Sequence, residues 1–522
     1  MLKLNVPGTD PVLKNKAETR PKAVAEWLDH LPFASPTDTA QQLLMALYAL
    51  NRQPLDADDR ITLLALYRPV VARAAASLEA RLVDSGVPPQ TQQRQTGTLL
   101  RELHLEHSIG YKQVLLGLSN RRFGRANPKH LAEACAWLLA ALRDFKTACY
   151  LSYSPLPAGL WQEIHHIFQF AQTTGLANEV VENAPPASLT YRQALLTELA
   201  SPPHMNPAEL ELTQAYLGKF AMLAPLTPVT ADLPRPGFLI PVQDDRAAGQ
   251  LTDTPQAGDL WLSTETLCRH LHETVLRLRA GDTPRQIGLP KEMESEPSSE
   301  LMKRLMKRWG NVAQRAFKRY TGGSDSTLQL LAGIGAIHRQ FDPAPPPGLS
   351  GNDIDDNLPF CDLKPFAAPA SAQITQWTIS NDSAAGLALL GAPGISLSLK
   401  VGDPLALRVN ENEAWSLAVI RWVRMRDAQQ VELGIERISP QVQAVWVQPL
   451  RGRRQARPEP ALFIPGLAAL KQPDRLLLPR LLYQIGLDAE IWHGERHYAL
   501  SFGRCAEHSS SFDLVEFTVL PD

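Results

Sequence analysis

Cysteine is scarce in this chain, which has five cysteines in 522 residues. They are scattered, their number is odd, and no Cys-x-x-Cys pair occurs: Cys135, Cys149, Cys268, Cys361 and Cys505. A disulfide framework needs paired cysteines in an oxidising compartment, so this pattern argues against one. We therefore expect reduced, mostly buried thiols and a cytoplasmic protein.

Long apolar runs are also missing. No segment approaches about 18 apolar residues without a charge, which is the length that crosses a bilayer. The first residues, Met1–Gly8, have no apolar core of the length that a signal peptide needs. We therefore expect no membrane span.

The chain has no excess of charge of either sign. Lys and Arg number 52 against 54 Asp and Glu, so the formal net charge is −2. This balance gives no global attraction to nucleic acid or to an anionic membrane, and any anion binding must be local. Hydrophobic residues at 44% and charged residues at 20% are typical of a soluble globular protein. The length is too great for one core and predicts three or four domains.

Motifs of common catalytic and metal sites are absent or incomplete. There is no Gly-x-x-x-x-Gly-Lys-Ser/Thr loop and no Gly-x-Ser-x-Gly elbow. Glu163 and His166 have the spacing of a di-iron motif, but no partner motif stands out on another helix. Cys268, His270 and His272 are close in sequence, yet His270 would point away from the other two on a helix. We expect no enzyme activity, no bound metal and no cofactor.

Residues 1–225 carry helical periodicity and few strand signals, which predicts an N-terminal helical domain that folds by itself. Ser35 at an N-cap, followed by Pro36, marks the start of one helix. The expected helices span residues 21–30, 36–51, 56–83 with a kink near Pro69, 90–118, 128–153, 160–174, 188–199 and 206–223.

Beyond residue 225 the pattern becomes mixed and then β-rich. Residues 226–300 predict a small mixed segment that ends in a polar linker. Residues 301–450 predict a β-barrel preceded by a basic helix, and residues 458–522 predict a compact β-rich module after a second linker. The barrel strand candidates include residues 327–338, 395–400, 404–409, 415–425 and 431–438. The expected fold class is multidomain α plus β.

Residues 301–319 contain a row of arginines. At about 100° per residue, Arg304, Arg308, Arg315 and Arg319 fall within roughly 60° of one another on a helix. Apolar side chains gather on the opposite side, so the pattern predicts an amphipathic helix. The row is either a solvated helix face or a binding surface for an anion.

A second polar feature is the run Asn381-x-Ser383-x-x-Gly386, which lies between two apparent strands. It offers an amide and a hydroxyl to a ligand, and Gly386 either lets the ligand approach closely or adopts a positive φ. The same residue types are common in plain β-turns. Arg421, Trp422 and Arg424 lie in a nearby strand candidate. They either follow simple alternation, or an arginine that projects from this strand flanks the ligand.

The order of these features resembles the PilZ domain, a small β-barrel that binds cyclic di-GMP. In that family an Arg-x-x-x-Arg element precedes an Asp/Asn-x-Ser-x-x-Gly turn, and here these are Arg315 to Arg319 and Asn381 to Gly386. The chain departs from the family pattern at Gln314, where an arginine is frequent, and in a long insertion at residues 340–375.

The resemblance implies a non-enzymatic cyclic di-GMP receptor of bacterial signalling. Arg315 and Arg319 would clamp phosphate and guanine, Asn381 and Ser383 would hydrogen-bond the ligand, and Gly386 would shape the turn. The helical domain would relay binding to a protein partner. The alternative is a PilZ-like scaffold that has lost its ligand, which the departures from the pattern favour.

Overall fold

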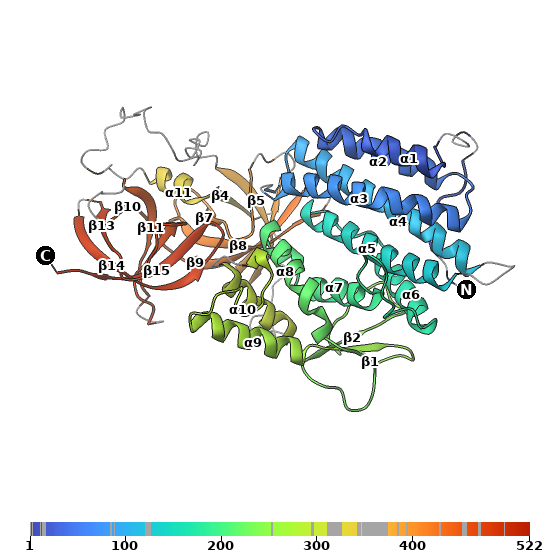
Figure 1. The fold of residues 1–522 in the computed structure, drawn as a ribbon. Helices are drawn as coiled ribbons and strands as arrows, with labels where there is room; N and C mark the ends of the chain where they lie inside the picture. Colours follow the sequence, from blue (N-terminus) through green and yellow to red (C-terminus); the bar gives the residue numbers. More distant parts are fainter. Residues whose placement is uncertain are drawn as a thin grey trace. The chain divides into compact units, whose positions relative to one another are not determined.

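The computed structural model divides the chain into two compact units, described here one at a time (Figure 1). Unit 1 comprises residues 1–85 and 89–314, and unit 2 comprises residues 86–88 and 315–522. The structure describes residues 2–521 except 3, 11, 13–16, 84–85, 88, 121–126, 252–253, 294–296, 311–325, 342–345, 347–373, 384–385, 393–394, 396, 427–429, 451–456, 468–470 and 495. The predicted fold class, multidomain α plus β, is confirmed.

The helices of unit 1 begin and end close to the predicted positions. In α2, the buried residues Leu43, Leu47 and Leu50 lie on one face, as their spacing predicts. Pro36 occupies the first helical position, where its missing N–H costs nothing. The first eight α-helices are α1 (Pro21–Asp29), α2 (Pro36–Asn51), α3 (Ala57–Leu82), α4 (Thr91–Ser119), α5 (Pro128–Leu151), α6 (Leu160–Thr173), α7 (Ala187–Leu199) and α8 (Pro207–Phe220), with short 3-10 turns η2 (Pro202–His204) and η3 (Ala221–Leu223).

Helix α3 is, within the described part of the chain, the one helix long and apolar enough to cross a membrane by length and composition. Its apolar residues include Leu64, Val71 and Leu78, which are buried in the core of unit 1. A core helix of a globular domain has the same composition, so this helix is weak evidence for a membrane span.

Unit 1 continues well past residue 225, where the sequence prediction ended the helical domain. A three-stranded sheet in the order β1-β3-β2 and two further helices complete it. Trp309 of the last helix is fully buried, and its indole Nε1 donates to the Leu196 carbonyl of α7 at 3.0 Å. The basic helix expected to precede the barrel therefore packs into the core of unit 1. These elements are β1 (Leu226–Pro228), β2 (Gly237–Ile240), β3 (Leu260–Ser263), α9 (Glu265–Arg279), η4 (Lys291–Met293) and α10 (Pro297–Gly310).

Unit 2 begins with a closed six-stranded barrel in the order β4-β5-β6-β9-β8-β7. The predicted strand over residues 327–338 is a strand only in its first half. Gly333 has φ +86°, a conformation that favours glycine, and α11 follows it directly. The predicted strand over residues 395–400 is wrong within its described residues, where Leu399 forms only an isolated bridge with Val87. The elements are β4 (Thr327–Ala332), α11 (Ile334–Gln340), β5 (Thr375–Ser383), β6 (Gly386–Gly391), β7 (Pro404–Arg408), β8 (Ser416–Met425) and β9 (Val431–Ser439).

A second closed six-stranded barrel, in the order β10-β11-β12-β15-β14-β13, forms the C-terminal module. It starts at β10, before the stretch 451–458 that the sequence suggested as a linker. The reason is that Gln443 to Val447 of β10 pair antiparallel with β11. Its strands are β10 (Gln443–Pro449), β11 (Glu459–Ile464), β12 (Arg475–Pro479), β13 (Asp488–His493), β14 (Arg496–His508) and β15 (Phe512–Val519).

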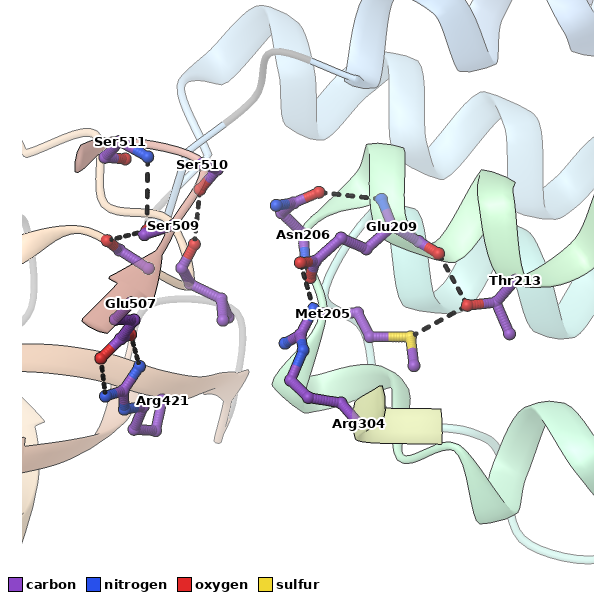
Figure 2. A network of polar contacts seen from close by, with 12 residues as sticks. Met205, Asn206, Glu209, Thr213, Arg304, Arg421, Glu507, Ser509, Ser510 and Ser511 are labelled. Atoms are coloured by element: carbon purple, nitrogen blue, oxygen red, sulfur yellow. Dashed lines mark hydrogen bonds and ion pairs between the residues drawn. The ribbon is translucent and has the colours of Figure 1, made fainter. Parts of the chain in front are cut away.

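The two barrels of unit 2 share one apolar cluster. Leu417 and Val419 on the outside of the first barrel pack in it with Leu462 and Phe512 of the second. Hydrogen bonds also join the two barrels (Figure 2). The Ser509 hydroxyl donates to the Gly402 carbonyl at 2.7 Å, and the Ser510 hydroxyl donates to the Val401 carbonyl at 3.2 Å. The two barrels therefore share one packed contact surface.

Candidate ligand-binding face

The polar run singled out in the sequence lies at the tip of the β5–β6 hairpin. Strand β5 continues through Asn381 to Ser383, and β6 begins at Gly386, so the run belongs to two paired strand ends. The Ser383 hydroxyl donates to the Gly386 carbonyl at 3.0 Å and closes the hairpin. Asn381 and Ser383 are half-buried. Among contacts between described residues, none involves the Asn381 side-chain amide, which leaves that group available to a ligand.

The packing of the barrel explains why residue 386 is a glycine. A Cβ at this position would lie 2.0 Å from the carbonyl oxygen of Ile435, in the neighbouring strand β9. Its φ is not among the positive values of the described glycines. The close approach that requires glycine is therefore that of β9, and the positive φ considered from the sequence is wrong.

A continuous row of cross-strand pairs leads from Asn381 across the barrel. Asn381 pairs with Ala388 of β6, Ala388 pairs with Gly434 of β9, and Gly434 pairs with Trp422 of β8. Directly paired residues point to the same side of a sheet. The carboxamide of Asn381 and the indole of Trp422 thus lie on one face of the barrel, which we call the Asn381–Trp422 face.

The indole of Trp422 lies flat against the backbone of Gly434. A Cβ at residue 434 would come within 1.8 Å of the indole Nε1. Beside it, the guanidinium carbon of Arg424 lies 5.4 Å from the indole ring centroid. Arg424 also pairs with Glu432 through its Nε, at 2.7 Å. An aromatic plane with a guanidinium next to it is a surface on which a nucleobase stacks.

Arginine is also present at the hairpin tip itself. Arg437 of β9 is exposed, and its Nη2 lies 3.4 Å from an Asp382 carboxylate oxygen. Its Nη1 donates to the Ser383 carbonyl at 3.5 Å. Exposed pairs of this kind are weak, so Arg437 is free to exchange Asp382 for a phosphate.

Arg421 has a different role from its neighbour Arg424. It occupies a bulge in β8, between the pairs of Ile420 and Trp422. Its guanidinium forms a fork with Glu507 of the second barrel, at 2.5 and 3.0 Å (Figure 2). Its Nε also donates to Glu436 at 2.6 Å. Burial by itself would lower the pKa of Arg421, but the bonds to Glu507 and the charge of Glu436 raise it overall. Arg421 therefore has a structural role, because its ion pair with Glu507 joins the two barrels.

The structure places three of the five predicted site residues and does not describe the other two. Asn381, Ser383 and Gly386 come together at the hairpin tip. Arg315 and Arg319 lie outside the described residues, as does Gln314. Sequence reasoning missed Trp422 as an aromatic platform and missed Arg437. A Trp and a Gly in adjacent strand candidates were a usable signal, but pairing them requires the register of β8 against β9.

The clusters considered for metals have structural explanations. Glu163 pairs with Lys112 at 2.6 Å. The His270 Nδ1 lies 2.8 Å from the Tyr216 hydroxyl, so this ring is held by the core. The one described group with metal-ligand geometry is Cys505, His508 and Asp513, in β14 and β15. Burial raises the pKa of the Cys505 thiol to about 12. Arg480 Nη1 pairs with the buried Asp513 carboxylate at 2.5 Å. The positive charge of Arg480 already balances the Asp513 carboxylate, so this group does not need a metal ion for charge balance.

Three family models match consecutive parts of the chain. The N-terminal domain of the cyclic-di-GMP receptor FimW matches residues 22–231, its middle PilZ domain matches residues 365–444, and its C-terminal β-barrel domain matches residues 445–520. A curated relative, the cyclic-di-GMP receptor FimW of Pseudomonas aeruginosa, is 26% identical over 99% of this chain and 93% of its own length. No solved structure matches the chain significantly. The boundary at residues 444 and 445 falls within β10, two residues after the start of the first strand of the second barrel.

Proposed function

Because the chain belongs to the FimW family of PilZ-domain proteins, we propose that it is a cyclic di-GMP receptor, a nucleotide-binding signalling protein and not an enzyme. The observation that carries the proposal is the row from Asn381 to Trp422. It puts a hydrogen-bonding amide and an aromatic plane on one face of the first barrel. Cyclic di-GMP presents both a base edge and a base plane to such a face.

Each group on the face has a separate task. The Trp422 indole stacks on one guanine, and Arg424 adds a guanidinium beside it. The amide of Asn381 bonds the edge of a guanine, and the Ser383 hydroxyl, which donates to the Gly386 carbonyl, accepts a hydrogen bond beside it. Arg437 attracts a phosphate once it leaves Asp382.

Arg315 and Arg319 remain the proposed clamps for phosphate and guanine. Their support is the spacing Arg-x-x-x-Arg and their place in the chain before β4. The match to a PilZ domain covers residues 365–444, which lie after both arginines. Guanidinium forks suit phosphate oxygens because two parallel N–H bonds fix both distance and orientation. Gly386 contributes indirectly, since it lets β6 approach β9 and so sets the hairpin in place.

The signal would pass from the barrel to a protein partner in the cytoplasm through the helices of unit 1. The size of unit 1 supports this role, because its helices form a core of their own and leave a large surface for contacts. Four cysteines in the described residues are free, which suits a reducing compartment.

The test is calorimetric titration of the full chain with cyclic di-GMP, with cyclic di-AMP as the matched ligand that differs in its bases. We expect saturable heat with cyclic di-GMP and at least tenfold weaker binding of cyclic di-AMP, because the base edges differ while the phosphates do not. No heat with either ligand would refute the receptor and favour the alternative, a scaffold that uses its PilZ-like barrel only for protein contacts.

A further inference from the structure

A cavity of about 480 Å³ is lined by residues of unit 1. It is lined by the end of α7, the short turn η2, strand β2 and helix α10. None of the residues expected to bind cyclic di-GMP contributes to it. Its lining combines two kinds of side chain, one basic and one apolar.

The basic side of the cavity carries more positive than negative charge. Arg304, Lys307 and Arg308 come from successive turns of α10. One carboxylate balances this group among the described residues, that of Glu209, which pairs with Arg304 (Figure 2). Glu209 is itself fixed, because its other oxygen accepts from the backbone N–H of Asn206 at 3.2 Å. Three cations against one carboxylate leave two positive charges without a counter-ion.

His204 completes the polar lining. Its Nδ1 lies 2.9 Å from the Ser201 hydroxyl. Ser201 has φ +64°, a left-handed conformation that is strained for a residue with a side chain. Burial, followed by the charges of Arg308 and Arg304, lowers the pKa of His204 to about 4. Burial and the charge of Arg304 likewise lower the pKa of Arg308. The side chains of Lys307 and Arg308 are exposed. The neighbouring cations repel one another, and a bound anion would relieve that repulsion.

The apolar side of the cavity is preformed. Met205 and Phe238 line it with the small part of their side chains that stays exposed, 6% and 4%, and Leu305 is fully buried next to it. The volume falls within the range of sites for small organic ligands and exceeds what a bare inorganic ion needs. An anion with an organic part therefore fits both walls.

We propose that this cavity binds the phosphate group of a small organic phosphate of nucleotide size. Arg308 and Lys307 contact the phosphate, His204 donates a hydrogen bond from Nε2, and the apolar wall holds the organic part. Arg304 stays paired with Glu209 and positions the rest of α10. This site is independent of the cyclic di-GMP site proposed on the barrel.

Pyrophosphate titrated into the full chain by calorimetry tests the site, because it presents phosphate chemistry without a base. We expect one pyrophosphate per chain, and at least tenfold weaker binding after Arg308→Ala. Arg308→Lys should bind with intermediate affinity, since it keeps the charge and loses the fork. The control Arg279→Ala changes an exposed arginine on α9 and should bind like wild type. Thermal melting of each variant checks that it folds.

Equal pyrophosphate affinity in wild type and Arg308→Ala, or no binding to wild type, would overturn the proposal. A second titration identifies the source of the phosphate. Cyclic di-GMP is added to Trp422→Ala, whose barrel face is impaired. Residual binding that disappears in Trp422→Ala/Arg308→Ala makes cyclic di-GMP itself the ligand of this cavity. No residual binding, with pyrophosphate still bound, assigns the cavity to another organic phosphate.

Discussion

The indole of Trp422 and the backbone of Gly434 lie so close that a Cβ on residue 434 would be 1.8 Å from the indole Nε1. The two residues are direct cross-strand partners in β8 and β9. A tryptophan can lie flat on this part of the barrel only because its partner has no side chain. The pair therefore creates an aromatic surface in line with Asn381.

Trp422→Ala should weaken cyclic di-GMP binding about tenfold or more. The reason is the lost stacking surface, which contributes roughly 1–3 kcal/mol per base in comparable sites. Calorimetry measures the affinity. Gly434→Ala should weaken binding as well, because the new methyl group displaces the indole.

The matched control is Trp492→Ala. Trp492 is also half-buried and also lies in a strand, but in the second barrel, where it stacks on His497. It should leave the affinity unchanged. An equal loss of affinity in both tryptophan variants would show a general effect on unit 2. It would contradict the role of Trp422 as a stacking surface for guanine.

Arg319→Ala should weaken cyclic di-GMP binding more than Arg304→Ala. Arg319 belongs to the predicted motif pair, and loss of a charge-assisted contact costs about 1.5–3 kcal/mol, roughly ten- to a hundredfold in affinity. Arg304 pairs with Glu209 in unit 1 and has no place in that motif. Calorimetry measures the affinity of both variants for cyclic di-GMP. Small and equal losses of affinity would mean that the arginine row is only a general basic patch.

Asn381→Ala should change the thermal stability little and should abolish most of the stabilisation that added cyclic di-GMP confers. Its amide has no partner among the described contacts, so the expected loss without ligand is within about 0.5 kcal/mol. Ligand that binds only the native state raises the melting temperature by mass action. Melting scans with and without cyclic di-GMP separate the two effects.

Ser383→Ala serves as the companion variant. It also removes the hydrogen bond to the Gly386 carbonyl, so a loss of roughly 0.5–1.5 kcal/mol is expected without ligand. A full ligand-induced shift in both variants would remove Asn381 and Ser383 from the site. Gly386→Ala is unsuitable as a probe, because its Cβ would collide with the Ile435 carbonyl and disturb the barrel.

A fragment of residues 1–314 should be more stable than a fragment ending at residue 225. Trp309 and Leu305 of α10 are buried in the core of unit 1, and the Trp309 indole bonds the Leu196 carbonyl. Cutting at residue 225 exposes the surfaces that these side chains cover. Urea unfolding followed by circular dichroism compares the fragments, and equal stability would mean that residues 226–314 add nothing to that core.

Most elements of unit 1 were predictable because helical periodicity is a local signal. Pro36 and the spacing of Leu43, Leu47 and Leu50 define α2 without reference to the rest of the chain. The placement of α10 was not predictable. Its arginines suggested a surface before the barrel, whereas Trp309 and Leu305 on its other side bind it to α7, far away in sequence.

The candidate site was predictable only in part for the same reason. Asn381 and Ser383 form a local motif and were found. Trp422 and Arg437 join them through strand register, which depends on the bulges in β5 and β8. A shift of one residue would move each side chain to the other face, and no single-sequence pattern fixes that shift.

The free energy of unfolding should fall as the pH is lowered from about 6.5 to 4. Burial lowers the pKa of His165 from 6.5 to about 4, although the hydrogen bond to the Arg246 carbonyl acts in the opposite direction. A depressed folded-state pKa means that the unfolded chain binds the proton first, so acid favours unfolding in this window. At about 1.4 kcal/mol per pKa unit, this shift can lower the free energy of unfolding by at most about 3 kcal/mol.

His165→Gln keeps a donor and an acceptor but does not titrate. Urea unfolding at pH 6.5 and at pH 4.5 should therefore give a smaller loss for this variant than for wild type. His107, whose pKa burial lowers to about 3, keeps its contribution in both proteins. An identical loss in both would mean that His165 titrates normally in the folded chain.

The most direct test of the central claim is the titration of the full chain with cyclic di-GMP beside the same titration of Asn381→Ala/Trp422→Ala. The account predicts saturable binding to wild type and a loss of at least a hundredfold in the double variant, with its melting temperature nearly unchanged. Binding of wild type and double variant with the same affinity would contradict it, because the ligand would then occupy a surface other than the Asn381–Trp422 face.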